Sequence, residues 1–169
     1  MENNKLPERK NNRVKDWDYS ANGCYFITIC TESRKHILSR FNKTCVGDGF
    51  PVPELTKAGN IIDDYINNIN MKYPDVKVDK YVIMPNHIHM LLFIDKKGTG
   101  NPSPTVGNII GWFKYNTTKS INELSGISGK KIWQRSYYDH IIRDERDYIE
   151  KRNYIKNNPQ KWEKDKYYI

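Results

Sequence analysis

The sequence predicts an α+β fold of the ferredoxin-like kind: a split βαβ sandwich with a four-stranded antiparallel sheet, helices packed on it and an extra C-terminal helix. Three observations predict it. The apolar patterns run strand, helix, strand, strand, helix, strand, helix along the chain. Stretches rich in Gly and Pro separate them. The length of 169 residues suits one domain with a single core.

The first half of the chain contains one strand pattern and one helix pattern. Residues 23–31, GCYFITICT, alternate in polarity and are rich in β-branched and aromatic types, which predicts a strand. Residues 39–55 carry several Gly and Pro and predict a loop or an irregular hairpin. From Thr56 onward, apolar residues recur at helical spacing and predict a helix that Pro74 ends.

The central region predicts a β-hairpin followed by a second helix. Residues 76–84 and 87–94 have the composition of strands, and Pro85 and Asn86 between them indicate a tight turn. A second amphipathic helix starts at Val106 and is broken by the glycine-containing stretch SGISGKK.

The C-terminal part predicts one more strand and the extra helix. Residues 136–143, SYYDHIIR, have the composition of a strand. Asp144 is a suitable N-cap for a helix over residues 145–158, which Pro159 stops.

Charge and hydropathy narrow the class of partner. The chain has 28 Lys and Arg against 20 Asp and Glu, a net charge of +8, which favours nucleic acid and, less strongly, an anionic membrane surface. Residues 1–18 are expected to be a basic arm, and residues 19–169 a single domain. No apolar run approaches the roughly 18 residues of a membrane helix, and the first residues lack the apolar core of a signal peptide. A cytoplasmic protein is expected.

Two histidines stand at the head of the third predicted strand, in PNHIH. Alternate residues of a strand point to the same side, so His87 and His89 share a face, and Leu91 continues it. Because apolar residues occupy both faces further along, this strand is expected to be central. Two imidazoles held side by side are good ligands for one metal ion, with positions left open for a substrate. With oxygen ligands they suit Mg²⁺ or Mn²⁺. The alternative is that one or both are ordinary histidines at the rim of the sheet.

The last helix carries a tyrosine off its apolar stripe. Tyr148, Ile149 and Ile155 are expected to pack on the core, which leaves Tyr154 on the polar face. Asn158 is four residues further on, so its amide projects beside Tyr154 and offers a third, oxygen ligand to a metal. On spacing alone, a plain surface tyrosine is the favoured interpretation, because the chain contains twelve tyrosines.

The segments DWDYSANGCYFITICTESRKHIL, PNHIH and WQRSYYDHIIRDERDYIEKRNYIKNNPQKW together resemble the HUH single-tyrosine transposases, in particular their REP-associated tyrosine transposase branch. The resemblance covers about residues 15–162. It implies that His87 and His89 hold a divalent cation, Mg²⁺ or Mn²⁺, that Tyr154 is the nucleophile, and that Asn158 is a third ligand.

The resemblance also implies a reaction and a substrate. Single-stranded DNA flanked by a hairpin is cleaved through a covalent 5′-phosphotyrosine intermediate and rejoined, by a monomer or a homodimer. Tyr137 and Tyr138 are competing nucleophiles, ranked lower because their strand is expected within the sheet.

Several basic and aromatic residues are candidates for DNA contacts. Phosphates are the expected partners of Lys114, Lys119, Lys131, Arg135 and, in the N-terminal arm, Arg13. Bases are expected to stack on Trp133 and Tyr138. The alternative is that the cations are only solvated and that Trp133 belongs to the core.

Three other functions fit parts of the sequence. They are a nucleic-acid-binding module without catalysis, a metal-dependent hydrolase that uses water, and a nickase of the replication-initiator or relaxase type. Loss of activity on replacing Tyr154 by Phe separates the tyrosine-dependent enzymes from the hydrolase.

Overall fold

A computed structural model describes residues 18–19, 21–41, 52–96 and 104–168. Its main sheet has four antiparallel strands in the order β4-β5-β1-β6. The strands are β1 (Gly23–Cys30), β4 (Val76–Ile83), β5 (His87–Ile94) and β6 (Tyr138–Ile142). The helices are α1 (Lys57–Asn67), α2 (Ile69–Lys72), α3 (Val106–Ser125) and α4 (Glu145–Asn157). The predicted α+β sandwich is confirmed, with β5 in the interior of the sheet.

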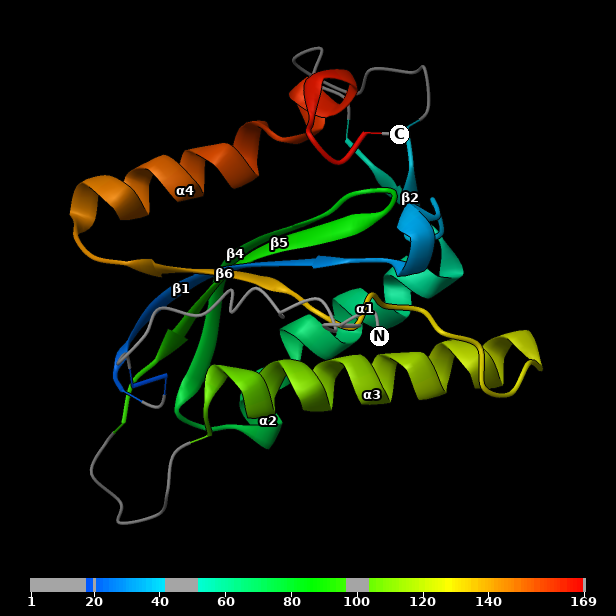
Figure 1. Cartoon of the computed structure of the whole chain (residues 1–169), viewed down its shortest axis with the longest axis horizontal. Coiled ribbons are helices and arrows are strands. Elements are labelled where there is room, and N and C mark those ends of the chain that lie inside the picture. Colours follow the sequence, from blue (N-terminus) through cyan, green and yellow to red (C-terminus); the bar gives the residue numbers. More distant parts are fainter. Residues whose placement is uncertain (1–17, 20, 42–51, 97–103, 169) are drawn as a thin grey trace, which may run out of the picture.

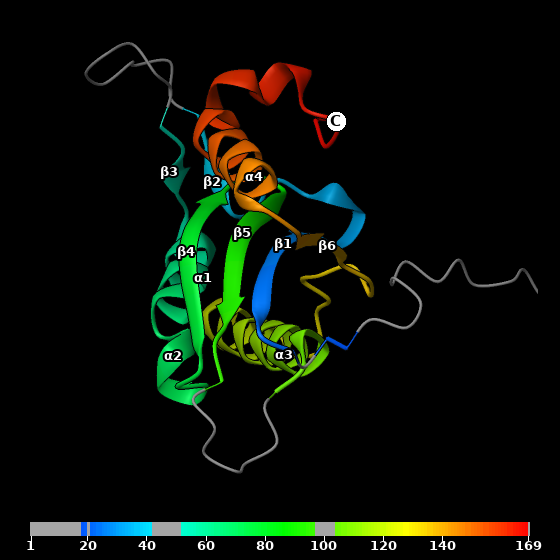
Figure 2. The same cartoon turned by 90° about the vertical axis from the view of Figure 1, so that its left-hand side faces the viewer.

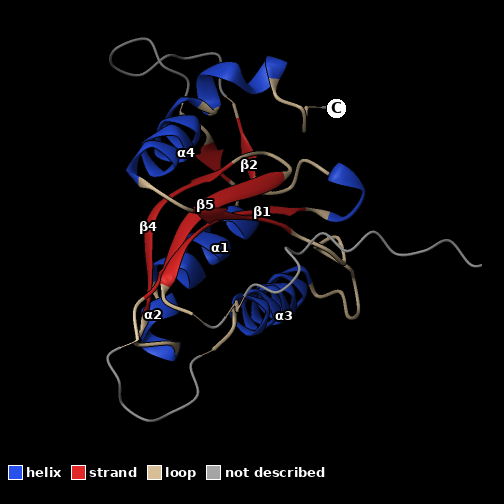
Figure 3. Cartoon of the chain, turned by 60° about the vertical axis from the view of Figure 1, so that its left-hand side comes forward, coloured by secondary structure: helices blue, strands red, loops and turns tan. Residues whose placement is uncertain are grey.

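The helices lie in two layers. Figures 1 and 2 show α1, α2 and α3 on one face of the sheet, and α4 on the other. Figure 3 shows the strands as the layer between them. The predicted extra C-terminal helix is therefore the element that covers the second face. A 3₁₀ helix, η2 (Pro159–Lys164), follows it.

The alternation of side chains assigns each residue of β5 to one of these layers. Ile88, Met90 and Leu92 enter the larger core, which α1, α2 and α3 cover. His87 and His89 point to the opposite face, where they lie beside Cys30 and Thr28 of β1. Further along that face, Leu91 packs with Phe26 and Ile155 under α4.

Side-chain caps explain where the helices begin. Thr56, Thr105 and Asp144 each accept a hydrogen bond from the backbone N–H three residues on. Gly126 ends α3 with a φ of 64°, a left-handed conformation that glycine adopts without strain.

Residues 39–55 were expected to form a loop or an irregular hairpin, and the antiparallel pairing of β2 (Ser39–Arg40) with β3 (Glu54–Leu55) agrees with the hairpin. Two details differ from the sequence-based expectations. Ile149 was expected in the buried stripe of α4, but it is 48% exposed, and Ile155 is the only buried residue of that helix. Strand β6 was expected within the sheet, but it forms an edge.

Two further expectations concern the chain ends and membranes. The basic arm of residues 1–18, with Arg13, lies almost wholly outside the described residues. Among the residues that are described, no helix is long and apolar enough to cross a membrane.

Candidate functional site

The site is centred on the two histidines at the start of β5. Their ring centroids are 4.5 Å apart. The Nδ1 atom of His87 lies 2.8 Å from the Asn86 side-chain oxygen, and that of His89 lies 2.8 Å from the Thr28 hydroxyl. Asn86 is oriented by its own amide N–H, which donates to the backbone oxygen of Tyr167. This leaves His87 Nδ1 as the donor to Asn86, and makes Nε2 the nitrogen with a free lone pair.

Both Nε2 atoms are buried without a hydrogen-bond partner among the described residues. Burial lowers the pKa of His87 to about 4, and the carboxylate of Asp165 opposes this in part. Burial and the neighbouring His87 lower the pKa of His89 well below its usual value. Both imidazoles are therefore neutral at pH 7, which is the form that binds a metal ion.

A carboxylate from the C-terminal segment completes a group of metal-ligand type. Ligand atoms of His87, His89 and Asp165 all lie within 4.8 Å of one another. One carboxylate oxygen of Asp165 accepts from the Tyr167 backbone N–H at 2.7 Å, and the other from the Asn158 amide. Asp165 is not among the ligands predicted from the sequence, because it stands between two lysines beyond the last predicted helix, where no pattern marks it.

Asn158, the predicted third ligand, reaches the same site. Its side chain is buried, and its oxygen Oδ1 has no hydrogen-bond partner within the described part of the chain. Its amide nitrogen is occupied by Asp165. The structure thus offers two oxygen donors, with Asp165 the charged one.

Tyr154 lies beside the histidines. Its ring contacts that of His89 at a centroid distance of 5.2 Å and that of Phe26 at 5.9 Å. Its hydroxyl donates to Asp165 at 3.5 Å. Burial and the negative charge of Asp165 raise the pKa of Tyr154, so the phenol is protonated at neutral pH in this arrangement.

A pocket of about 630 Å³ opens beside Tyr154. Tyr138, on edge strand β6, lines it and is 46% exposed. Four lysines, Lys151, Lys161, Lys164 and Lys166, line the pocket together with two acidic residues, Glu150 and Asp165. The excess of positive charge suits an anionic group such as a phosphodiester.

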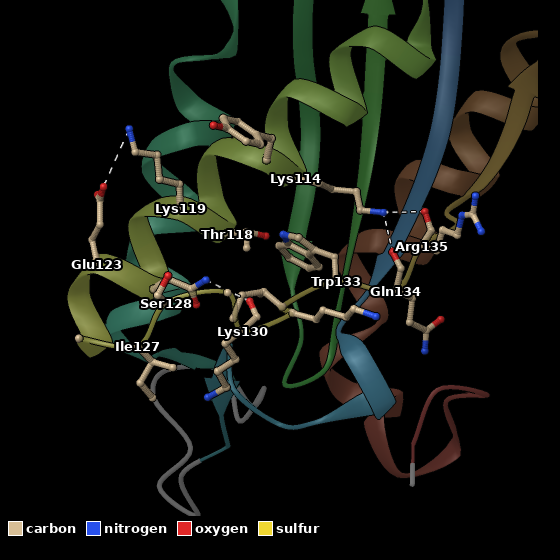
Figure 4. Close-up of a pocket in the computed structure, with 16 residues that line it drawn as sticks. Lys114, Thr118, Lys119, Glu123, Ile127, Ser128, Lys130, Trp133, Gln134 and Arg135 are labelled. Atoms are coloured by element: carbon tan, nitrogen blue, oxygen red, sulfur yellow. Dashed lines mark hydrogen bonds and ion pairs between the residues drawn. The ribbon is translucent and has the colours of Figure 1, made fainter.

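Most of the other predicted DNA-binding residues lie elsewhere, on the α3 side of the sheet. Figure 4 shows a second pocket there. It is lined in part by Lys114, Lys119, Lys131, Trp133 and Arg135. Trp133 is only 6% exposed, and its indole N–H donates to Thr117, so its ring belongs to the core and is not presented to a base. Lys114 donates to the backbone oxygens of Gln134 and Arg135.

The antiparallel sheet holds two histidines beside a tyrosine that a helix carries. This arrangement matches the class of protein that the sequence resemblance implies, the single-tyrosine transposases. Comparison with known families identifies it: residues 20–158 match the family described as "Transposase IS200 like". The chain belongs to that transposase family. The suspected likeness to its REP-associated branch is confirmed.

Individual relatives agree with this assignment. A Haemophilus influenzae protein of uncharacterised function is 33% identical over 97% of this chain and 95% of its own length. Another from the same organism, named "Putative REP-associated tyrosine transposase", is 25% identical over 85% of this chain and 74% of that protein. The solved structure of a REP-associated tyrosine transposase bound to a REP hairpin has a TM-score of 0.56 at 20% identity, covering 89% of this chain and 74% of that one. This likeness supports the fold.

Proposed function

We propose that this chain is a divalent-metal-dependent DNA strand transferase that cleaves single-stranded DNA beside a hairpin and uses Tyr154 as the nucleophile. One observation carries the proposal: ligand atoms of His87, His89 and Asp165 lie within 4.8 Å of one another, beside the Tyr154 hydroxyl, and both histidine Nε2 atoms have no hydrogen-bond partner among the described residues. The hairpin enters by analogy with the relative that was solved with one.

The donor atoms fit a divalent cation. Two neutral imidazole nitrogens and one carboxylate oxygen form a set that Mn²⁺ and similar ions accept, and Asn158 Oδ1 offers a further oxygen. Buried polar atoms without partners are costly, at about 1–3 kcal/mol each, so a ligand that satisfies them is expected. A cation bound there would draw negative charge from the phosphodiester and orient the scissile bond.

The protein's own groups provide the rest of the chemistry. The Tyr154 oxygen attacks the phosphorus and forms the new P–O bond, while the bond from phosphorus to the 3′ oxygen breaks. Asp165, which accepts the hydrogen bond of the Tyr154 hydroxyl, is placed to take its proton. The leaving 3′ oxygen takes one proton from solvent water and becomes a 3′-hydroxyl. Attack by another 3′-hydroxyl on the phosphotyrosine reverses these steps and rejoins the strands, which requires no nucleotide cofactor.

A single chain supplies the histidines, the carboxylate and the tyrosine. Of the two expected oligomeric states, monomer and homodimer, the monomer is therefore sufficient to assemble this site. The lysines around the pocket, such as Lys164 and Lys166, are placed to hold phosphates of the bound strand.

The test compares Tyr154→Phe with Tyr138→Phe, since both tyrosines line the same pocket. Labelled hairpin oligonucleotides from the flanks of the gene are incubated with Mn²⁺ or Mg²⁺ and resolved on a denaturing gel. We expect a covalent protein–DNA band in the wild type and in Tyr138→Phe, and none in Tyr154→Phe or with chelator. Cleavage that survives in Tyr154→Phe would instead establish a hydrolase that uses water.

A further inference from the structure

The C-terminal segment, residues 165–168, contains one tyrosine that is far more buried than its neighbour. Figure 1 shows this segment in red, on the α4 side of the sheet. Tyr167 is only 7% exposed, whereas Tyr168 is 48% exposed. Tyr167 stands two residues after Asp165, the carboxylate that groups with the histidines. It is not among the residues that line the Tyr154 pocket, so its place in the fold suits a structural contact to the site better than a contact to a substrate.

The ring of Tyr167 packs against both histidines and two cations. Its centroid lies 4.6 Å from the ring centroid of His87 and 5.7 Å from that of His89. The guanidinium carbon of Arg34 lies 4.5 Å from the Tyr167 ring centroid, and the ammonium of Lys166 lies 4.9 Å from it. A cation at this distance is attracted to the face of an aromatic ring. The ring is therefore held by residues that are distant in the sequence as well as by its own segment.

The backbone of Tyr167 connects two of the candidate metal ligands. Its carbonyl oxygen accepts from the Asn86 amide at 2.8 Å, and the Asn86 side-chain oxygen lies 2.8 Å from Nδ1 of His87. Its N–H donates to the Asp165 carboxylate at 2.7 Å. A continuous series of hydrogen bonds therefore runs from His87 to Asp165, and Tyr167 supplies two of its links. Displacement of Tyr167 would break both.

The segment that carries Arg34 is held in a strained conformation. Ser33 and Arg34 have φ angles of 53° and 55°, and the described part of the chain contains no other non-glycine residue with a positive φ. Such a conformation persists only where the surrounding structure imposes it. Here the Asn86 backbone oxygen accepts from both the N–H and the hydroxyl of Thr31. The turn before the histidines thus fixes the backbone from which the Arg34 guanidinium reaches Tyr167.

We infer that Tyr167 is a positioning residue: its ring, packed against Arg34 and His87, anchors the C-terminal segment and thereby holds the Asp165 carboxylate beside the two histidines. This rests on the proposed function, and it gives the placement of the charged ligand to a residue outside the Tyr154 pocket. The ring and the backbone of Tyr167 make the anchoring contacts, so its hydroxyl is not required.

The first measurement tests the anchor without metal. Hydrogen–deuterium exchange with mass spectrometry follows the C-terminal peptide that starts at Pro159. Tyr167→Ala removes the ring, Tyr167→Phe keeps it, and Tyr168→Ala is the matched control at the exposed neighbouring position. We expect exchange at least about tenfold faster in Tyr167→Ala, and the wild-type rate in the other two. If thermal melting shows that Tyr167→Ala does not fold, Tyr167→Leu takes its place, because it keeps apolar volume without the aromatic face.

The second measurement is the affinity for Mn²⁺, by calorimetric titration of the same proteins. Tyr167→Ala should bind Mn²⁺ at least about tenfold more weakly than the wild type, as for other residues that orient a metal ligand. Tyr167→Phe and Tyr168→Ala should bind as the wild type does. In an Asp165→Asn background, Tyr167→Ala should weaken binding no further, because the carboxylate that it positions is already absent. A merely structural role would weaken binding equally in both backgrounds.

Wild-type exchange in Tyr167→Ala, or an equal loss of Mn²⁺ affinity with and without the Asp165 carboxylate, would overturn the inference. The exchange measurement also separates this inference from the proposed function. If the wild type binds no Mn²⁺ and Tyr167→Ala still exchanges faster, the anchor is established and the metal dependence of the proposed function is wrong. Neither measurement involves cleavage, so both are independent of whether Tyr154 proves to be the nucleophile.

Discussion

At the scale of residues, burial rather than residue type makes His87 and His89 candidate ligands. Other histidines of the chain are at least partly exposed, and His140, for example, donates its Nε2–H to the Asp147 carboxylate. His87 and His89 instead have one nitrogen fixed by a neighbour and the other left without a partner in the described residues. A hydrogen bond that fixes Nδ1 is a usual way in which a protein orients an imidazole so that its Nε2 faces a metal.

Asp165 and Asn158 compete for the role of third ligand, and metal affinity separates them. Because Asp165 carries charge and groups with both histidines, we expect Asp165→Asn to weaken Mn²⁺ binding at least about tenfold. Asn158→Ala should have a smaller effect, since part of the role of Asn158 is to orient Asp165. Calorimetric titration of the metal-free protein with MnCl₂ measures both.

Glu163→Gln is the control for this titration, because it removes the same charge from an exposed position nearby. It should bind Mn²⁺ as the wild type does. The opposite ranking, with Asn158→Ala the weaker binder and Asp165→Asn unaffected, would restore Asn158 as the third ligand, as predicted from the sequence.

At the scale of elements, the start of α1 is fastened to the turn that precedes the histidines. The Leu38 backbone oxygen accepts from both the N–H and the hydroxyl of Thr56, while the Leu38 N–H donates to the Pro85 oxygen. Gly59 sits against this junction, and a Cβ added there would lie 2.1 Å from the Leu38 oxygen. Only glycine allows the helix to approach so closely.

Replacing Gly59 by Ala should therefore destabilise the protein by about 1–3 kcal/mol, because the backbone must shift to admit the methyl group. Gly111→Ala is the matched control, since that helical position has no neighbouring atoms within 4 Å. It should be stabilising by about 0.5–1 kcal/mol. Urea unfolding followed by circular dichroism measures both. If the Gly59→Ala protein is as stable as the Gly111→Ala protein, the backbone at this junction shifts without a cost in free energy.

At the scale of the whole molecule, the two layers of helices create two different environments. The α1–α3 layer encloses the larger core and supplies a wall of the second pocket. The layer of α4 and the C-terminal segment covers the second face only in part, and there it buries the histidines while leaving a pocket open. Buried neutral histidines make the stability of the metal-free protein depend on pH.

The direction of this dependence follows from the depressed pKa of His87, about 4 in the folded protein against 6.5 ordinarily. Below about pH 6.5 the unfolded chain takes up a proton that the folded chain does not. The free energy of unfolding should therefore fall as the pH is lowered towards 4, by about 3 kcal/mol from His87 alone. His89 acts in the same direction.

Urea unfolding between pH 4 and pH 7, in the presence of chelator, tests this expectation. The double variant His87→Gln/His89→Gln should lose most of the dependence, whereas His140→Gln, at a partly exposed position, should keep it. If the free energy of unfolding falls equally with pH in the wild type and in both variants, groups other than His87 and His89 cause the dependence.

The sequence by itself determined the order of the elements and the side of β5 that carries the histidines. Both follow from local periodicity: strand residues alternate with a period of 2 and helix residues with 3.6, whatever the rest of the chain does. The same reasoning put Tyr154 off the apolar stripe of α4 and Asn158 four residues beyond it, and both reach the site.

Only the tertiary structure decided which distant groups meet. The return of the C-terminal segment brings Asp165 to the histidines, and no local pattern encodes that return. The sheet order exposes Tyr138 at an edge and leaves Trp133 in the core. Burial, the cause of the lowered histidine pKa values, is likewise a sum of contacts from β1, α4 and the C-terminal segment. Each of these depends on the long-range packing of the chain, which residue spacing does not specify.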